Sequence, residues 1–119
     1  MLISRLSQSI TFDGIPDEEP WQSISPLNLT MYQPVYGKEP SEKSDLRIGY
    51  DDKYLYLGGR MYYNDSGMIR SSSFKRDYMG MGSDWLGIII DTYNDKENGL
   101  AFFTTPDALR WDASVLKDA

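Results

Sequence analysis

The chain has 119 residues, a formal net charge of −6, and neither histidine nor cysteine. This length fits one domain, and 40% hydrophobic residues are enough to build a core. The negative charge disfavours nucleic acid as a partner, because its phosphates would be repelled. Without histidine and cysteine there can be no Ser-His-Asp or Cys-His catalytic system, no Cys/His zinc site and no disulfide. Any bound metal would be a hard cation held by oxygen atoms.

Short alternating segments separated by turn residues recur along the chain, which is typical of an all-β protein. Its N-terminal part is expected to contain, in order, a strand at residues 9–12, a helical turn at 17–21, a strand at 27–32 and a loop at 33–44. The helical turn has an acidic start and ends on Trp21. We expect Trp21 to be buried beside the strand that contains Phe12.

A β-hairpin is the clearest signal in the middle of the chain. Residues 45–50 alternate apolar and polar side chains, Asp51-Asp52-Lys53 forms the turn, and residues 54–62 return. A second turn is predicted at residues 64–67, and a polar, glycine-rich stretch follows at 71–83.

Another pair of neighbouring antiparallel strands is predicted within residues 83–112. An apolar run closed by Asp91 is followed by a turn rich in Asn, Asp and Gly, and then by Leu100-Ala101-Phe102-Phe103. After Asp112 no further strand is expected. These elements predict an all-β sandwich of about six strands, either complete or a fragment of a longer domain.

Aromatic rings beside polar side chains indicate a carbohydrate site. The apolar C–H face of a sugar ring stacks on Trp or Tyr, while charged and amide groups bind its hydroxyls. The candidates for carbohydrate binding are Tyr78, Trp85, Trp111 and Arg76. The alternative is that these rings pack the core and that Arg76 pairs with a neighbouring acid.

Acidic residues gather at turns and strand ends, as at Asp51-Asp52, Asn64-Asp65, Asp84 and Asp91. Calcium takes about 6–8 oxygen ligands, which can come from several loops. The alternative is that each carboxylate forms a turn or caps a backbone segment.

Several segments, taken in order, resemble one family. They are Ile10–Trp21, Tyr50–Leu57, Lys75-Arg76-Asp77, Asp84–Asp91 and Asn98–Phe102. Together they look like the family 9 carbohydrate-binding module domain, in the variant found at the N-terminus of large bacterial proteins whose remainder is predicted to form an outer-membrane β-barrel. The resemblance implies that residues 1–119 form a single jelly-roll β-sandwich domain with bound calcium, and that the domain continues past Ala119.

The resemblance also implies site residues. The calcium ligands that it implies are Asn64, Asp65 and Asp84. It aligns the sugar-stacking Trp of the family with Met81, the acidic residue of the strand with Gly87, and an Arg-x-Asn pair with Phe103 and Thr105. Because these positions are apolar or small here, a bound sugar would need another aromatic platform.

Three functions compete. The first is a non-catalytic domain that binds an oligosaccharide for a larger bacterial surface or carbohydrate-degrading protein. The second is an interaction domain that has lost the sugar site and packs on the rest of its parent chain. The third is a haem-binding relative that would rely on Met61, Met79 or Met81.

No nucleophile–base pair supports catalysis by the domain itself. No apolar run approaches the roughly 20 residues of a membrane helix, and residues 1–6 do not resemble a signal peptide. By the resemblance, the parent protein is periplasmic, outer-membrane-associated or secreted.

Overall fold

The computed structural model describes residues 2–73, 75–78, 80 and 82–117. The chain divides into two compact units, Met1–Asn64 (unit 1) and Asp65–Ala119 (unit 2), and each contains one three-stranded sheet. The predicted all-β class is confirmed. The sheet of unit 1 is mixed, and that of unit 2 is antiparallel. The single domain and its jelly-roll connections stay predictions.

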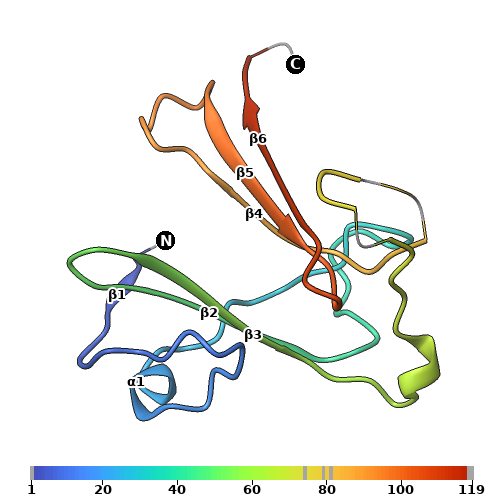
Figure 1. Cartoon of the computed structure of the whole chain (residues 1–119), viewed down its shortest axis with the longest axis horizontal. Helices are drawn as coiled ribbons and strands as arrows, with labels where there is room; N and C mark the ends of the chain where they lie inside the picture. The colour runs from blue at the N-terminus through green and yellow to red at the C-terminus, as the bar shows by residue number, and fades with distance from the viewer. Residues whose placement is uncertain (1, 74, 79, 81, 118–119) are drawn as a thin grey trace. The chain divides into compact units, whose positions relative to one another are not determined.

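The sheet of unit 1 is built on the predicted hairpin. Its strands are β1 (Ser4–Arg5), β2 (Ser44–Tyr50) and β3 (Leu55–Met61), in the order β1-β2-β3 (Figure 1). β2 and β3 are antiparallel, with Ser44 opposite Met61 and Tyr50 opposite Leu55, so the hairpin is confirmed. β1 adds to the other edge of β2 in the parallel direction.

A short helix covers part of one face of this sheet. α1 (Glu19–Gln22) confirms the predicted helical turn, and Trp21 is buried, with 4% of its surface exposed. The Trp21 ring packs with Leu6 and Ile24 to form the core of unit 1. It lies on Gly58 of β3, where a Cβ would stand 3.0 Å from its Cη2 and Cζ2 atoms. A glycine at this point of the strand therefore leaves room for the indole.

Two strand predictions in unit 1 are wrong. Residues 9–12 form no strand, and Phe12 is 98% exposed, so Trp21 does not pack beside a strand there. The amide of Thr11 donates to the Glu18 carboxylate instead, at 2.7 Å. Residues 27–32 are also irregular. Pro26 has no N–H to donate, and the Leu27 amide makes one bond to β2, at 2.7 Å to the Leu46 carbonyl oxygen.

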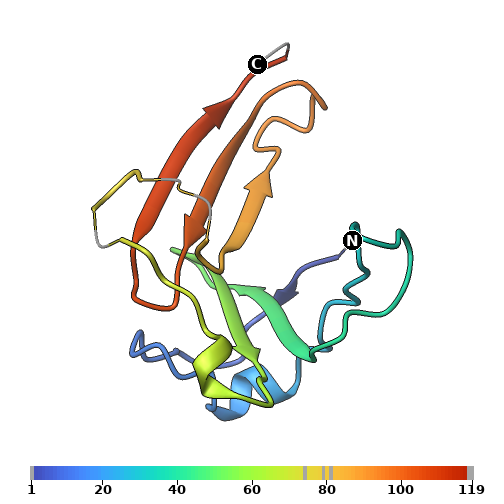
Figure 2. The ribbon, with the colours of Figure 1, turned by 90° about the vertical axis from the view of Figure 1, so that its right-hand side faces the viewer.

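Unit 2 contains the 3₁₀ helix η1 (Ser66–Met68) and the strands β4 (Leu86–Ile90), β5 (Gly99–Thr104) and β6 (Arg110–Val115). The strands lie side by side in the order β4-β5-β6, and both pairs are antiparallel (Figure 2). β4 and β5 confirm the predicted pair. β6 corrects the prediction that no strand continues after Asp112: residues 110–115 alternate, and Trp111, Ala113 and Val115 are more covered than their neighbours.

Candidate functional site

Three aromatic rings meet on one face of the sheet in unit 2. Trp85 immediately precedes β4, Phe103 lies in β5 and Trp111 lies in β6, directly opposite Phe103. The centroids of Trp85 and Phe103 are 6.5 Å apart, and those of Phe103 and Trp111 are 5.4 Å apart. Both pairs are edge-to-face, a preferred arrangement of aromatic rings. We call these half-buried residues the aromatic cluster.

Gly87 makes room for this cluster. It faces Phe103 in the register of β4 and β5, and a Cβ at Gly87 would lie 2.2 Å from Cε1 of Phe103. The Phe103 ring therefore lies over the backbone of Gly87. Any side chain at position 87 would have to displace the central ring of the cluster.

The two other predicted carbohydrate residues lie on the preceding loop. The Arg76 guanidinium pairs with Asp112, and its Nε is 3.5 Å from Oδ2 of Asp77, which confirms the ion-pair alternative. Because neighbouring residues of a strand face opposite sides, Asp112 and Trp111 point to different faces of the sheet. Tyr78 is 45% exposed, and its ring lies against Gly80 of its own loop. The structure thus brings together Trp85 and Trp111, adds Phe103, and engages Arg76 elsewhere.

The predicted calcium ligands all make hydrogen bonds within their own unit. In unit 1, the Asn64 amide donates to the Glu42 carboxylate at 3.2 and 3.3 Å. In unit 2, Asp65 accepts from the Gly67 amide at 2.9 Å and Asp84 accepts from the Arg70 amide at 2.8 Å. Among the described residues, no group of three or more acidic side chains is placed to hold a metal ion. Calcium binding stays a prediction.

Two further carboxylates stabilise hairpin turns. Asp51 accepts from the amides of Lys53 and Tyr54 and from the hydroxyl of Tyr56, and these hydrogen bonds lower its pKa. Asp95 accepts from the side chain and backbone of Asn98 and from the Glu97 amide, which lowers its pKa as well. Both carboxylates act as turn formers, in line with the alternative to a metal site.

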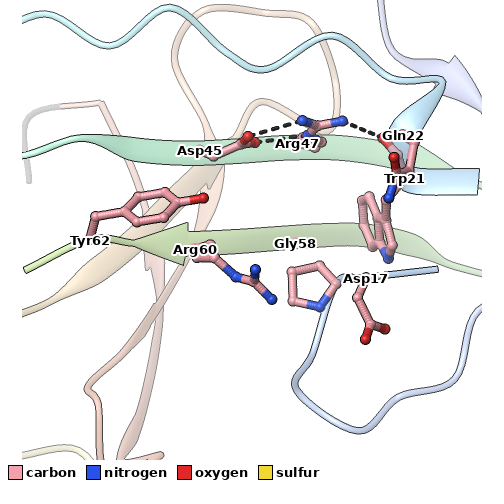
Figure 3. Close-up of a pocket in the computed structure, with 9 residues that line it drawn as sticks. Asp17, Trp21, Gln22, Asp45, Arg47, Gly58, Arg60 and Tyr62 are labelled. Atoms are coloured by element: carbon pink, nitrogen blue, oxygen red, sulfur yellow. Dashed lines mark hydrogen bonds and ion pairs between the residues drawn. The ribbon is translucent and has the colours of Figure 1, made fainter. Parts of the chain in front are cut away.

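A polar pocket of about 210 Å³ lies in unit 1 (Figure 3). It opens where α1 and the segment before it meet the β2–β3 hairpin. The charged residues of its lining are Asp17, Asp45, Arg47 and Arg60. Its other lining residues are Pro16, Trp21, Gln22, Gly58 and Tyr62.

Asp45 and Arg47 form a closed network on one side of this pocket. Nε and Nη2 of Arg47 donate to the two oxygens of Asp45 at 2.8 and 2.9 Å. Nη1 donates to the carbonyl oxygens of Trp21, at 2.7 Å, and Ile24, at 3.0 Å. The hydrogen bond from Arg47 lowers the pKa of Asp45, and the same bond raises that of Arg47. Arg47 therefore ties α1 to β2 and has few donors left for a ligand.

The sequence did not indicate this pocket, because its residues come from the β2–β3 hairpin and from the distant segment at residues 16–22. One signal was present. Gly58 follows the apolar and aromatic residues 55–57 of its strand, and a strand glycine often marks the close approach of another group. Its register partner, Arg47, sits on the same face as Asp45.

Comparisons of the chain with protein-family models, curated proteins and solved structures found no match. The resemblance to family 9 carbohydrate-binding modules therefore rests on the sequence motifs. Met81, the position that it aligns with the sugar-stacking Trp, lies outside the described residues, as does Met79. Among the helices of the described part of the chain, none has the length and apolarity to cross a membrane.

Proposed function

We propose that the chain is a non-catalytic carbohydrate-binding domain of a larger bacterial protein, and that the aromatic cluster is its stacking surface. The observation that carries this proposal is the meeting of Trp85, Phe103 and Trp111 on one face of the sheet in unit 2. Two of these three residues were candidates on sequence grounds alone. The rings come from β5, β6 and the residue just before β4 and are half-buried, so they are held in place and retain exposed surface.

The chemistry of the cluster favours stacking over hydrogen bonding. Its residues offer aromatic surface and two indole N–H donors. Arg76 is already paired with Asp112. A sugar bound here would gain most of its affinity from its C–H face, which predicts weak binding of neutral oligosaccharides.

The test is a titration with neutral cello-, xylo- and malto-oligosaccharides, followed by tryptophan fluorescence and by the indole N–H resonances. We expect Trp85→Ala and Trp111→Ala each to weaken binding up to about tenfold, the equivalent of the roughly 1 kcal/mol that an aromatic contact contributes. Tyr93→Ala is the matched control, since Tyr93 is 80% exposed in the β4–β5 loop and lies outside the cluster. If no oligosaccharide perturbs Trp85 or Trp111 at about 10 mM, the proposal is wrong.

An interaction domain is the second candidate, and the opposite face of the same sheet favours it. Leu100 and Phe102 of β5 are 39% and 44% exposed there. Exposed apolar groups on a sheet face are common in protein contacts. Sedimentation of the wild type beside Phe102→Ser tests this candidate: association through this face would be weakened in the variant, whereas a domain that only binds sugar would sediment alike in both forms.

A further inference from the structure

The pocket of unit 1 presents one cation and one anion that are not engaged with each other. Asp45 and Arg47 neutralise one another at 2.8 Å. Arg60 and Asp17 both line the pocket, and neither belongs to an ion pair among the described residues. Figure 3 shows the Arg60 guanidinium extending along β3 toward the end of the pocket where Asp17 and Trp21 lie.

We propose that this pocket binds a free amino acid, with the ligand carboxylate on Arg60 and the ligand ammonium on Asp17. The site lies in unit 1 and is independent of the aromatic cluster, so it does not rest on the proposed carbohydrate function. It would give the domain a second ligand of a different chemical class.

Arg60 is the natural partner of a carboxylate. A guanidinium presents parallel N–H donors that match the two oxygens of a carboxylate. Asp45 stands opposite Arg60 in the register of β2 and β3, but both of its oxygens already accept from Arg47. The guanidinium of Arg60 is exposed and keeps its donors for a ligand.

Asp17 selects a zwitterion over a simple anion. A phosphate or acetate ion at Arg60 would gain one attractive contact and would be repelled by the carboxylate of Asp17. An α-amino acid places its ammonium next to its carboxylate, so each ligand charge meets a charge of opposite sign. The total charge of the pocket then stays unchanged on binding.

The size and the walls of the pocket suit such a ligand. Its volume of about 210 Å³ lies below the roughly 300–1,000 Å³ of drug-sized sites, so the pocket suits a small ligand. Pro16 and Trp21 supply apolar wall against which an aliphatic side chain can rest. A branched amino acid such as leucine is therefore a suitable first probe.

Trp21 is a built-in reporter of binding. Its indole N–H is buried and has no hydrogen-bond partner among the described residues. Because the ring lines the pocket, an occupied pocket changes the environment of this N–H group. Its proton resonance can be followed by NMR apart from those of Trp85 and Trp111.

The experiment is a titration of the ¹⁵N-labelled chain with L-leucine up to about 10 mM. We expect the Trp21 indole resonance to shift saturably. Arg60→Gln and Asp17→Asn should each weaken binding by about tenfold or more, since each removes one charged hydrogen-bond partner. Lys53→Gln is the control, because Lys53 is an exposed cation in the β2–β3 turn and does not line the pocket.

Two ligand analogues test each contact separately. Leucine amide lacks the carboxylate charge, so its binding should be weak and insensitive to Arg60→Gln. N-acetyl-leucine lacks the ammonium charge, so its binding should be weak and insensitive to Asp17→Asn. If acetate shifts the Trp21 resonance with the same affinity as leucine, or if none of the common L-amino acids shifts it, the proposal is overturned.

Discussion

Replacing Trp21 tests the core of unit 1 most directly. A tryptophan side chain buries about 150–250 Å² of surface, and Trp21 is 4% exposed. At about 25 cal/mol per Å², that area corresponds to about 4–6 kcal/mol, an upper estimate because unfolded chains already bury some surface. Trp21→Ala should therefore lower the free energy of unfolding by about 3–5 kcal/mol, as large-to-small core substitutions do.

A second variant at the same position separates packing from hydrogen bonding. The buried Nε1 of Trp21 has no partner among the described residues, and a buried donor without a partner costs about 1–3 kcal/mol. Trp21→Phe removes this donor and keeps an aromatic ring over Gly58. Removing the unpaired donor offsets part of the free energy that is lost with the smaller buried ring. We therefore expect Trp21→Phe to lower the free energy of unfolding by about 1 kcal/mol or less.

Urea denaturation followed by far-UV circular dichroism measures both variants on the same scale. A loss below about 1 kcal/mol in Trp21→Ala would contradict the placement of this ring in the core. Equal losses in the Ala and Phe variants would show that the indole N–H makes a stabilising hydrogen bond.

Three other outcomes are expected. The pKa of Asp45 is lower in the folded chain than its unfolded value of about 3.9, so its pairing with Arg47 stabilises the fold above that pH and is lost as the pH falls through the lowered pKa. The difference in unfolding free energy between wild type and Asp45→Asn should accordingly be constant above about pH 5 and shrink below pH 4. Gly87→Ala should displace Phe103, which changes the indole resonances of the aromatic cluster and lowers the melting temperature. If calcium binds, excess calcium raises the melting temperature and a chelator reverses the rise; an unchanged midpoint contradicts a tight site.

The sequence predicted those elements whose signal is local. Leu46 and Ile48 alternate with polar residues over a whole strand, and Asp51 begins a turn that its own carboxylate then stabilises. β1 could not be predicted in this way, because a strand of two residues is too short to show an alternation of apolar and polar side chains. Residues 9–12 do alternate, but they form no strand, and the backbone bonds at this edge of β2 are made by β1 and Leu27.

The site was predictable only in part for the same reason. Trp85 and Trp111 stand out by residue type, whereas Phe103 reads as one more apolar residue of a buried strand. Only the register, in which Gly87, Phe103 and Trp111 lie in one row, makes these residues neighbours. The pocket of unit 1 also needs the segment at residues 16–22, which no local pattern connects to the predicted hairpin.

In both units an aromatic ring packs over a glycine of a strand: Trp21 over Gly58 in unit 1, and Phe103 over Gly87 in unit 2. In unit 2 this packing involves two positions at which the sequence resemblance implies other residues. The resemblance places an acidic residue at Gly87 and an arginine at Phe103, and an acidic side chain at 87 would collide with the phenyl ring, whose Cε1 lies 2.2 Å from the Cβ position. Gly87 and Phe103 therefore depend on each other, because the ring occupies the space that a side chain at position 87 would need. A glycan held here would be recognised by the shape of its apolar face, and its affinity would depend little on salt, since the cluster has no charged contact to be screened.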